Sequence, residues 1–186
     1  FTCLIGHAQI SIGGQPLPYI ITKSLSKELF IQMPPFNLEE QLQIDALESS
    51  DLRNGYRFAY KFMGNYTPDN SGIRFTLPDG TKVWRLGIHS PKAYSLNVLF
   101  SEYHLPEGAR LFLYNEEQTE ILGAFSHLNN SKLGLLPIAP LLGDKIIIEY
   151  QEPAKVSFPG KLTLGEINHG YRQIRVSEPQ PDQSSF

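Results

Sequence analysis

The sequence predicts an all-β protein, an antiparallel β-sandwich of the jelly-roll type with one short helix in its N-terminal part. Short strand patterns recur through most of the chain at a spacing of roughly 8 to 12 residues, without intervening helical patterns. The 15 glycines and 14 prolines supply the turn signals that short strands need. With 186 residues, 41% of them hydrophobic, the chain is long enough to bury one sizeable core. The absence of an internal repeat argues against a propeller or a solenoid.

Composition excludes several classes of protein. The formal net charge of -3 gives no overall electrostatic attraction to nucleic acid or to an acidic membrane. A single cysteine, Cys3, rules out an internal disulfide framework and a zinc site built from several cysteines. No stretch approaches the roughly 20 apolar residues that a transmembrane helix needs. We therefore expect a soluble globular protein with neither a nucleic-acid partner nor a transmembrane segment.

The first nine residues, FTCLIGHAQ, are a short apolar stretch that ends in the small-x-small pattern Gly6-His7-Ala8. Signal peptidases require small side chains at those two positions, so residues 1–8 are expected to be the remnant of a secretory signal peptide that is cleaved before Gln9. The alternative is an ordinary N-terminal strand. Under the first interpretation Cys3 belongs to the removed segment, because Phe1-Thr2 lacks the small residue that precedes a lipoprotein anchor.

The C-terminal residues 176–186 are polar and rich in proline and serine, with no periodicity, and are expected to form a linker. Residues 9–175 are then the folded domain. A chain that begins within its own signal peptide and ends in a linker is expected to be a fragment of a longer secreted polypeptide.

A short helix is predicted near residues 37–47, because Asn37 and Glu40 have the spacing of a capping box. Apolar positions at helical spacing share one face of this segment: Leu38, Leu42 and Ala46. A helix of this length is not stable alone, so we expect that face to pack on the larger body of the domain.

The strands follow in order along the chain. Residues 9–35 are expected to be mostly extended, residues 57–62 to form a strand, and residues 64–72 to form a loop. A hairpin is predicted from residue 73 onward, since Pro78-Asp79-Gly80-Thr81 combines a fixed proline φ with a glycine that accepts positive φ. After its return strand, further strands are predicted at residues 96–100, 110–114, 121–126, 134–138, 145–150 and 162–167.

Alternation assigns the two faces of the strand that returns from this hairpin. Trp84, Leu86 and Ile88 point to one side, which their apolar character marks as the core, and Arg85 points to the other. Glu149 also lies on the outward side of its strand. Arg85 and Glu149 are therefore candidates for a cross-strand pair.

The aromatic residues allow two interpretations. One set could form a platform for stacking sugar rings, as in carbohydrate-binding sandwiches: Trp84, Tyr94, Tyr103, Tyr114 and Tyr150. The alternation of Trp84 with leucine and isoleucine favours a place in the core instead.

No arrangement of residue types along the sequence marks an active site. There is no Gly-x-Ser-x-Gly turn, and the nearest nucleophile turn, Asn70-Ser71-Gly72, has no acid or histidine beside it. The five histidines occur singly and form no metal-binding pair: His7, His89, His104, His127 and His169. Asn65, Asp69 and Asn70 could offer oxygens to calcium, although a polar loop of this composition is usually a turn. The sequence therefore predicts no catalytic, cofactor-binding or metal-binding residue.

Several ordered strings are more specific than the fold requires. Residues 80–100 read GTKVWRLGIHSPKAYSLNVLF, and LPEGARLFLY, GAFS, NN, GDKIIIEYQEP and HGYR follow in order up to Arg172. These strings resemble the N-terminal domain of secreted bacterial trypsin-like serine endopeptidases of the lysyl-endopeptidase-like family. The resemblance covers roughly residues 9–175 and is strongest from Leu77 onward.

In that family the matching region precedes the protease domain, and the catalytic His, Asp and Ser lie beyond the position of Phe186, so no catalytic residue is carried onto this sequence. The resemblance implies export from a bacterial cell, of the Bacteroidetes type, with a secreted or cell-surface location. The expected partner is a C-terminal trypsin-like protease domain of the same polypeptide. The domain would assist folding of that protease or inhibit it. The alternative is an extracellular module that binds a glycan or a cell-surface protein. An enzyme in its own right is disfavoured, because the sequence displays no nucleophile–base pair.

Overall fold

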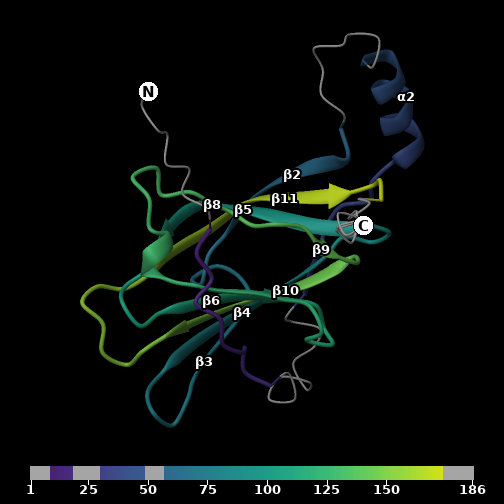
Figure 1. Cartoon of the computed structure of the whole chain (residues 1–186). Helices are drawn as coiled ribbons and strands as arrows, with labels where there is room; N and C mark the ends of the chain where they lie inside the picture. The colour runs from purple at the N-terminus through teal and green to yellow at the C-terminus, as the bar shows by residue number, and fades with distance from the viewer. Residues whose placement is uncertain (1–8, 19–29, 49–56, 174–186) are drawn as a thin grey trace, which may run out of the picture.

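The computed structural model describes residues 9–18, 30–48 and 57–173 of the chain. Two β-sheets pack face to face, and one short helix extends from one end of the sandwich (Figure 1). The predicted all-β sandwich is therefore confirmed. The expected signal-peptide remnant, residues 1–8, and the expected linker, residues 176–186, lie outside the described residues.

Sheet A has six strands in the order β1-β4-β10-β6-β7, with β3 also paired to β4. These strands are β1 (Phe30–Gln32), β3 (Ile73–Thr76), β4 (Lys82–His89), β6 (Arg110–Tyr114), β7 (Ile121–Phe125) and β10 (Lys145–Glu152). All pairings in sheet A are antiparallel except that of β1 with β4.

Sheet B has five strands in the order β2-β11-β5-β8, with β9 also paired to β5. These strands are β2 (Ala59–Tyr66), β5 (Ser95–His104), β8 (Leu136–Pro137), β9 (Leu141–Leu142) and β11 (Lys161–Gly170). From β2 onward the chain passes back and forth between the two sheets, so that β10 lies between β4 and β6, and β11 lies between β2 and β5. This is a jelly-roll winding.

Alternation of side chains gives sheet A two apolar faces. On β4, Trp84, Leu86 and Ile88 point into the core between the sheets and are almost fully buried, as predicted. The outer face of sheet A carries a second, smaller apolar cluster of Phe112, Tyr114, Ala124 and Ile147, with Phe30, Ile73 and Ile121 packed against it. On this outer face the predicted pair forms: Arg85 and Glu149 lie directly opposite each other on β4 and β10. Arg85 Nε donates to Glu149 Oε2 at 2.7 Å.

Several strands differ from their predicted limits; β5, predicted at residues 96–100, spans residues 95–104. β2 continues across Gly64 because Tyr66 still pairs with Leu164 of β11, so the loop expected from residue 64 begins at residue 67. The strand predicted at residues 134–138 is reduced to the two residues of β8. β11 is longer than predicted because it pairs along its whole length with β5.

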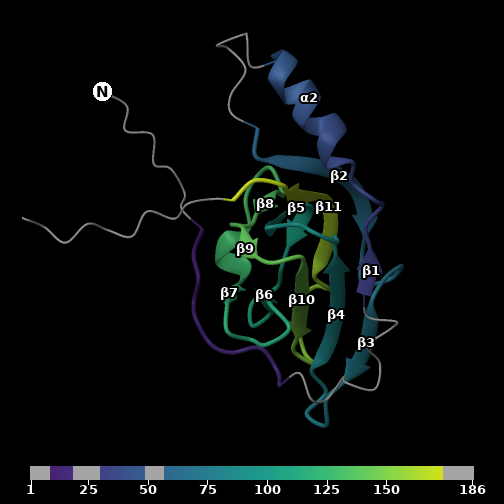
Figure 2. The same ribbon diagram turned by 90° about the vertical axis from the view of Figure 1, so that its right-hand side faces the viewer.

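The predicted helix is confirmed as α2 (Leu38–Glu48). Asn37 caps it: the Glu40 backbone N–H donates to Asn37 Oδ1 at 3.3 Å, and Asn37 Nδ2 donates to Glu40 Oε2 at 3.2 Å. The helix projects from the end of the sandwich beside β2 (Figure 2). Within the described ranges no helix has the length and apolar character that crossing a bilayer requires.

The prediction that α2 packs through its apolar face is wrong. That face is exposed to solvent and consists of Leu38, Leu42 and Ala46. The buried residue of the helix is Gln41, and Asp45, one turn later, accepts hydrogen bonds from Tyr171 Oη at 2.7 Å and from Arg172 Nη2 at 2.8 Å. Burial raises the pKa of the Asp45 carboxyl, but the hydrogen bonds from Tyr171, Gln41 and Arg172 outweigh burial and hold this pKa below its usual value. The helix therefore docks through an ionised polar face.

The loop from residue 67 to residue 72 is fixed against β4. Trp84 Nε1 donates to the Ser71 carbonyl at 2.7 Å. Gly72 has a φ of +67°, and a Cβ atom there would collide with the backbone carbonyl of Arg85. Only glycine permits both the positive φ and this close approach.

We expect Gly72→Ala to lower the free energy of unfolding by about 2 to 4 kcal/mol, because strain at positive φ adds to the collision with β4. Gly134→Ala is the matched control: Gly134 has a φ of +64°, but nothing lies within 4 Å of its added Cβ. This control should cost about 1 kcal/mol, from φ strain alone. Urea denaturation measures both values, and equal losses would show that Gly72 does not pin the loop.

Candidate ligand-binding cleft

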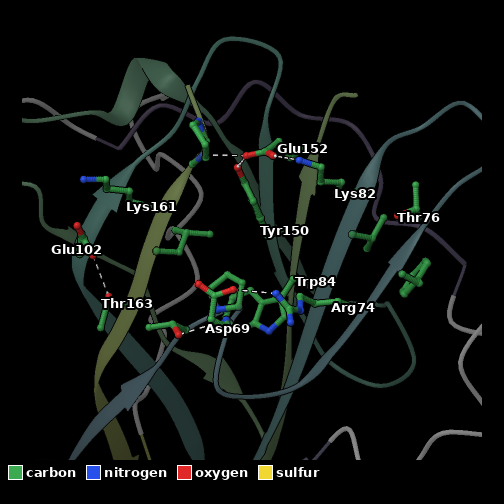
Figure 3. Close-up of a pocket in the computed structure, with 17 residues that line it drawn as sticks. Asp69, Arg74, Thr76, Lys82, Trp84, Glu102, Tyr150, Glu152, Lys161 and Thr163 are labelled. Atoms are coloured by element: carbon green, nitrogen blue, oxygen red, sulfur yellow. Dashed lines mark hydrogen bonds and ion pairs between the residues drawn. The ribbon is translucent and has the colours of Figure 1, made fainter. Parts of the chain in front are cut away.

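A cleft of about 630 Å³ opens between the two sheets near β3 and the start of β11. Figure 3 shows Lys161 and Thr163 on one side of the cleft, Thr76 on the other, and Tyr150 and Glu152 between them. Its polar lining residues come from both sheets and from the loop after β2. They include Asp69, Arg74, Thr76, Glu102, Lys161 and Thr163.

Two strand edges border the cleft. β3 pairs with β4 on one side, and among the described residues no strand pairs with its other side. The pairing of β11 with β2 begins only at Leu164. In the part of the chain that the structure describes, Lys161, Leu162 and Thr163 therefore have a strand partner, β5, on one side only. Edges of this kind present backbone N–H and C=O groups to which an extended chain can pair.

Glu152 forms the fixed back wall of the cleft. Its carboxylate accepts hydrogen bonds from the Gly160 N–H at 2.8 Å, from Tyr150 Oη at 2.8 Å and from Lys82 Nζ at 3.2 Å. Burial raises the pKa of Glu152, but these three donors outweigh burial and hold the pKa below its usual value. Burial, with the neighbouring Glu152, raises the pKa of the Tyr150 hydroxyl, which stays protonated and donates. The carboxylate thereby joins β4, β10 and the segment before β11.

The floor of the cleft is aromatic, but the rings do not form a stacking platform. Trp84 is 2% exposed, so its core interpretation is confirmed, and Tyr150, at 6% exposed, is buried as well. Tyr103 and Tyr114 are also fully buried, whereas Tyr94 lies on the surface. The five aromatic side chains therefore share no exposed face on which a sugar ring could stack.

The rim of the cleft carries balanced charge. Arg74 Nη1 pairs with Asp69 Oδ1 at 2.8 Å, and Glu102 Oε2 accepts a hydrogen bond from Thr163 Oγ1 at 3.1 Å. Lys161 is exposed at the mouth. Together with the Lys82–Glu152 pair, this gives as many basic as acidic side chains, so the cleft is suited to a neutral polar ligand rather than to a strongly charged one.

The loop oxygens considered for calcium are used within the turn. Asn70 Oδ1 accepts from the Thr67 N–H at 2.8 Å, Asn70 Nδ2 donates to the Asn65 carbonyl at 2.8 Å, and Asp69 pairs with Arg74. The turn interpretation is confirmed for this loop. Among the described residues no three His, Cys, Asp or Glu side chains converge to hold a metal ion.

The structure brings together a serine and a histidine that lie 79 residues apart, a pair that the sequence does not reveal. Ser90 Oγ and His169 Nδ1 are hydrogen-bonded at 2.7 Å. Both residues are at most 2% exposed, and the ring of Phe36 covers the imidazole at 4.6 Å between centroids. Burial lowers the pKa of His169, with Asp144 opposing, so the ring is neutral in the fold. The pair is buried and joins the residue after β4 to β11, and thus one sheet to the other.

The other described histidines remain apart. His89 Nε2 lies 3.5 Å from Asp144 Oδ2, and His104 stacks on Phe158 at 4.8 Å between centroids. His127 begins the short 3-10 helix η2 (His127–Asn129), and His7 lies outside the described residues.

The HGYR string has a structural explanation. His169 bonds to Ser90, a Cβ on Gly170 would collide with Ser95, and Tyr171 and Arg172 hold the Asp45 carboxylate of α2. Each of its four positions is thus fixed by a contact within the domain.

No model of a known protein family matches this chain.

We expect the free energy of unfolding to fall as the pH is lowered through about 6.5, the pKa of histidine in an unfolded chain. The pKa of His169 is lower in the fold, so between the two values the unfolded state binds a proton that the native state does not, and stability is lost toward acid. The slope contributed by one such proton is at most about 1.4 kcal/mol per pH unit.

Urea denaturation at pH 7.5 and pH 5.5 measures this loss. His169→Gln should abolish it, whereas His104→Gln, at an exposed position, should retain it. A wild-type protein that is equally stable at both pH values would contradict a buried neutral His169.

Proposed function

We propose that this domain is a non-catalytic accessory domain of a secreted trypsin-like serine endopeptidase, which assists folding of the protease or inhibits it by binding an extended segment of polypeptide in the cleft. The endopeptidase context is supported by the ordered strings between residues 80 and 172, which resemble that family. The binding mode is supported by the cleft itself. Its two bordering strand edges, on β3 and on β11, carry this proposal.

An extended polypeptide fits the cleft better than a glycan does. A peptide gains its main-chain hydrogen bonds by pairing with a strand edge, and both edges are present along the mouth. A glycan site would need an exposed aromatic face, whereas Trp84 donates its Nε1–H to Ser71 and Tyr150 donates its hydroxyl to Glu152 within the fold. The balanced charge of the rim also suits the neutral backbone of a peptide.

Exposed leucines on one segment of the chain support docking of this domain on another one. Exposed leucines lie on the segment that runs beside the outer edge of β5: Leu128, Leu133, Leu135 and Leu142. The segment is braced, since Asn130 accepts from the Leu105 N–H and donates to the Leu105 carbonyl, both at 2.9 Å. Apolar side chains held outward in this way favour an interface over free exposure to water.

The test combines the folded chain with the catalytic domain of a lysyl-endopeptidase-like enzyme. We expect the chain to raise the yield of active protease after refolding from denaturant, or to slow hydrolysis of a lysyl peptide substrate, and to do so saturably. Thr76→Trp, which places a large side chain in the cleft, and Lys161→Glu, which reverses the charge at its mouth, should each weaken the effect by about tenfold.

Lys92→Glu is the matched control, because Lys92 is exposed, does not line the cleft and lies outside the segment that carries the exposed leucines. It should act as the wild type does. If the chain neither assists nor inhibits the protease at a large molar excess, the endopeptidase proposal fails. If it acts but the two cleft variants act equally well, the protease is bound elsewhere than in the cleft.

The alternative function is that of an extracellular module that binds a glycan or a cell-surface protein. A glycan array probed with the same protein distinguishes the two proposals. Saturable glycan binding that Thr76→Trp abolishes would favour the alternative over the peptide-binding cleft.

A further inference from the structure

Residues 9–18 form a strap across the outer face of sheet A (Figure 2). The Ile12 N–H donates to the Ala124 carbonyl of β7 at 3.0 Å, and the Ala124 N–H donates to the Gly13 carbonyl at 3.3 Å. Gly14 then passes the Phe112 ring of β6, and the strap continues to β10 and β4. Most strap residues are exposed, and Pro16 is the buried one. The strap thus contacts sheet A through backbone hydrogen bonds and one buried proline, while most of its other side chains face solvent.

At the end of the strap, the backbone N–H and the backbone carbonyl of Leu17 are both hydrogen-bonded to side chains of the domain. The Leu17 N–H donates to Glu149 Oε1 at 2.8 Å. The Leu17 carbonyl accepts from Arg85 Nη2 at 3.1 Å and from Gln118 Nε2 at 2.9 Å. Arg85 and Glu149, themselves joined at 2.7 Å and both fully buried, therefore form a clamp on the backbone of a single residue.

The clamp is assembled by the sheet rather than by the strap. Glu149 also accepts hydrogen bonds from Tyr114 Oη at 2.8 Å and from Gln151 Nε2 at 2.6 Å. Burial, together with Glu149, raises the pKa of the Tyr114 hydroxyl and keeps it protonated as a donor. β4, β6 and β10 thus hold the two charged side chains in place. The carboxylate that accepts from Leu17 therefore has three hydrogen-bond partners that do not belong to the strap.

The sequence of the strap at the clamp is Pro16-Leu17-Pro18. The flanking prolines bring no N–H of their own, so Leu17 supplies the one backbone donor of this triplet, and Glu149 accepts from it. Prolines also favour the extended polyproline conformation, which lowers the entropy lost when such a segment binds. Pro16 is buried and Leu17 is half-buried. The site therefore constrains the side chain at position 16 more than the side chain of Leu17, whose backbone the clamp holds.

We infer that the Arg85–Glu149 clamp is a binding site for the backbone of an extended, proline-containing peptide, which residues 9–18 occupy in cis and a Pro-x-Pro segment of another polypeptide occupies when the strap is displaced. This inference does not depend on the cleft between the sheets, which lies on the other side of sheet A.

The test uses the full chain with a protease-cleavage sequence inserted between residues 18 and 30, so that the strap is cut only after the domain has folded. A fluorescein-labelled peptide of residues 9–18 is then added, and anisotropy is recorded as it exchanges with the cut strap. We expect saturable binding. A peptide with Leu17→Pro, which lacks the N–H donated to Glu149, should bind about tenfold more weakly, because a hydrogen bond to a buried charge is lost.

Two protein variants locate the binding. Glu149→Gln should weaken binding of the labelled peptide, whereas Lys161→Glu, in the cleft, should leave it unchanged. Three results would overturn the inference: equal binding of both peptides, peptide binding that responds to Lys161→Glu instead of Glu149→Gln, or loss of the native circular dichroism spectrum as soon as the cut strap dissociates. The last would mean that the clamp does not exist without the strap.

Discussion

The buried ion pair between Arg85 and Glu149 is the contact on which the outer half of this sandwich depends. Two opposite charges with no exposure to water are unfavourable unless nearly all their hydrogen-bonding groups find partners. Here Glu149 accepts from Arg85, Tyr114, Gln151 and the backbone of Leu17. Through its carboxylate, Glu149 therefore joins β4 to β10, accepts from a tyrosine of β6 and holds the backbone of the N-terminal strap.

Two further carboxylates with several hydrogen-bond donors lie where other elements meet. Glu152 joins β4 and β10 to the segment before β11, and Asp45 joins α2 to the residues that follow β11. Each carboxylate is ionised in the fold because its donors outweigh its burial. The apolar core holds the sheets together, and these polar contacts decide how the helix, the strap and the loops attach to it.

The cleft is a consequence of how the jelly roll is wound. β2 stops pairing with β11 at Leu164 and crosses to the other sheet, and the loop that follows is pinned by Gly72 against β4. After this crossing, the start of β11 pairs with β5 on one side only, and the outer side of β3 has no strand partner among the described residues. These two edges lie on either side of the aromatic floor of the cleft. A binding site bordered by strand edges suits a polypeptide ligand, because the backbone N–H and C=O groups of the ligand can hydrogen-bond to those of the edge.

Much of the fold could be predicted from the sequence, and little of the site. The period of two along β4 predicts Trp84 in the core and Arg85 on the outer face, because alternation is a local property. That Arg85 meets Glu149 is decided by the register of β4 against β10. The strap could not be found, since Leu17 meets Glu149 across 132 residues and has no periodic pattern around it. Ser90 and His169 are likewise joined only by the packing of two sheets. Helical spacing identifies the apolar face of α2 but not the element beside it, so the sequence does not reveal that Leu38 and Leu42 are exposed.

Hydrogen exchange at the Leu17 amide tests the account most directly, because this amide is the one donor of the Pro16-Leu17-Pro18 triplet and is held by Glu149. Measured by NMR under native conditions, its opening free energy can be compared with that of a core amide such as Ile148. We expect Leu17 to be protected, to open at lower free energy than Ile148, and to lose protection in Glu149→Gln. Exchange as fast as in a free peptide would contradict the clamp. Exchange only through global unfolding would contradict a strap that can leave its site.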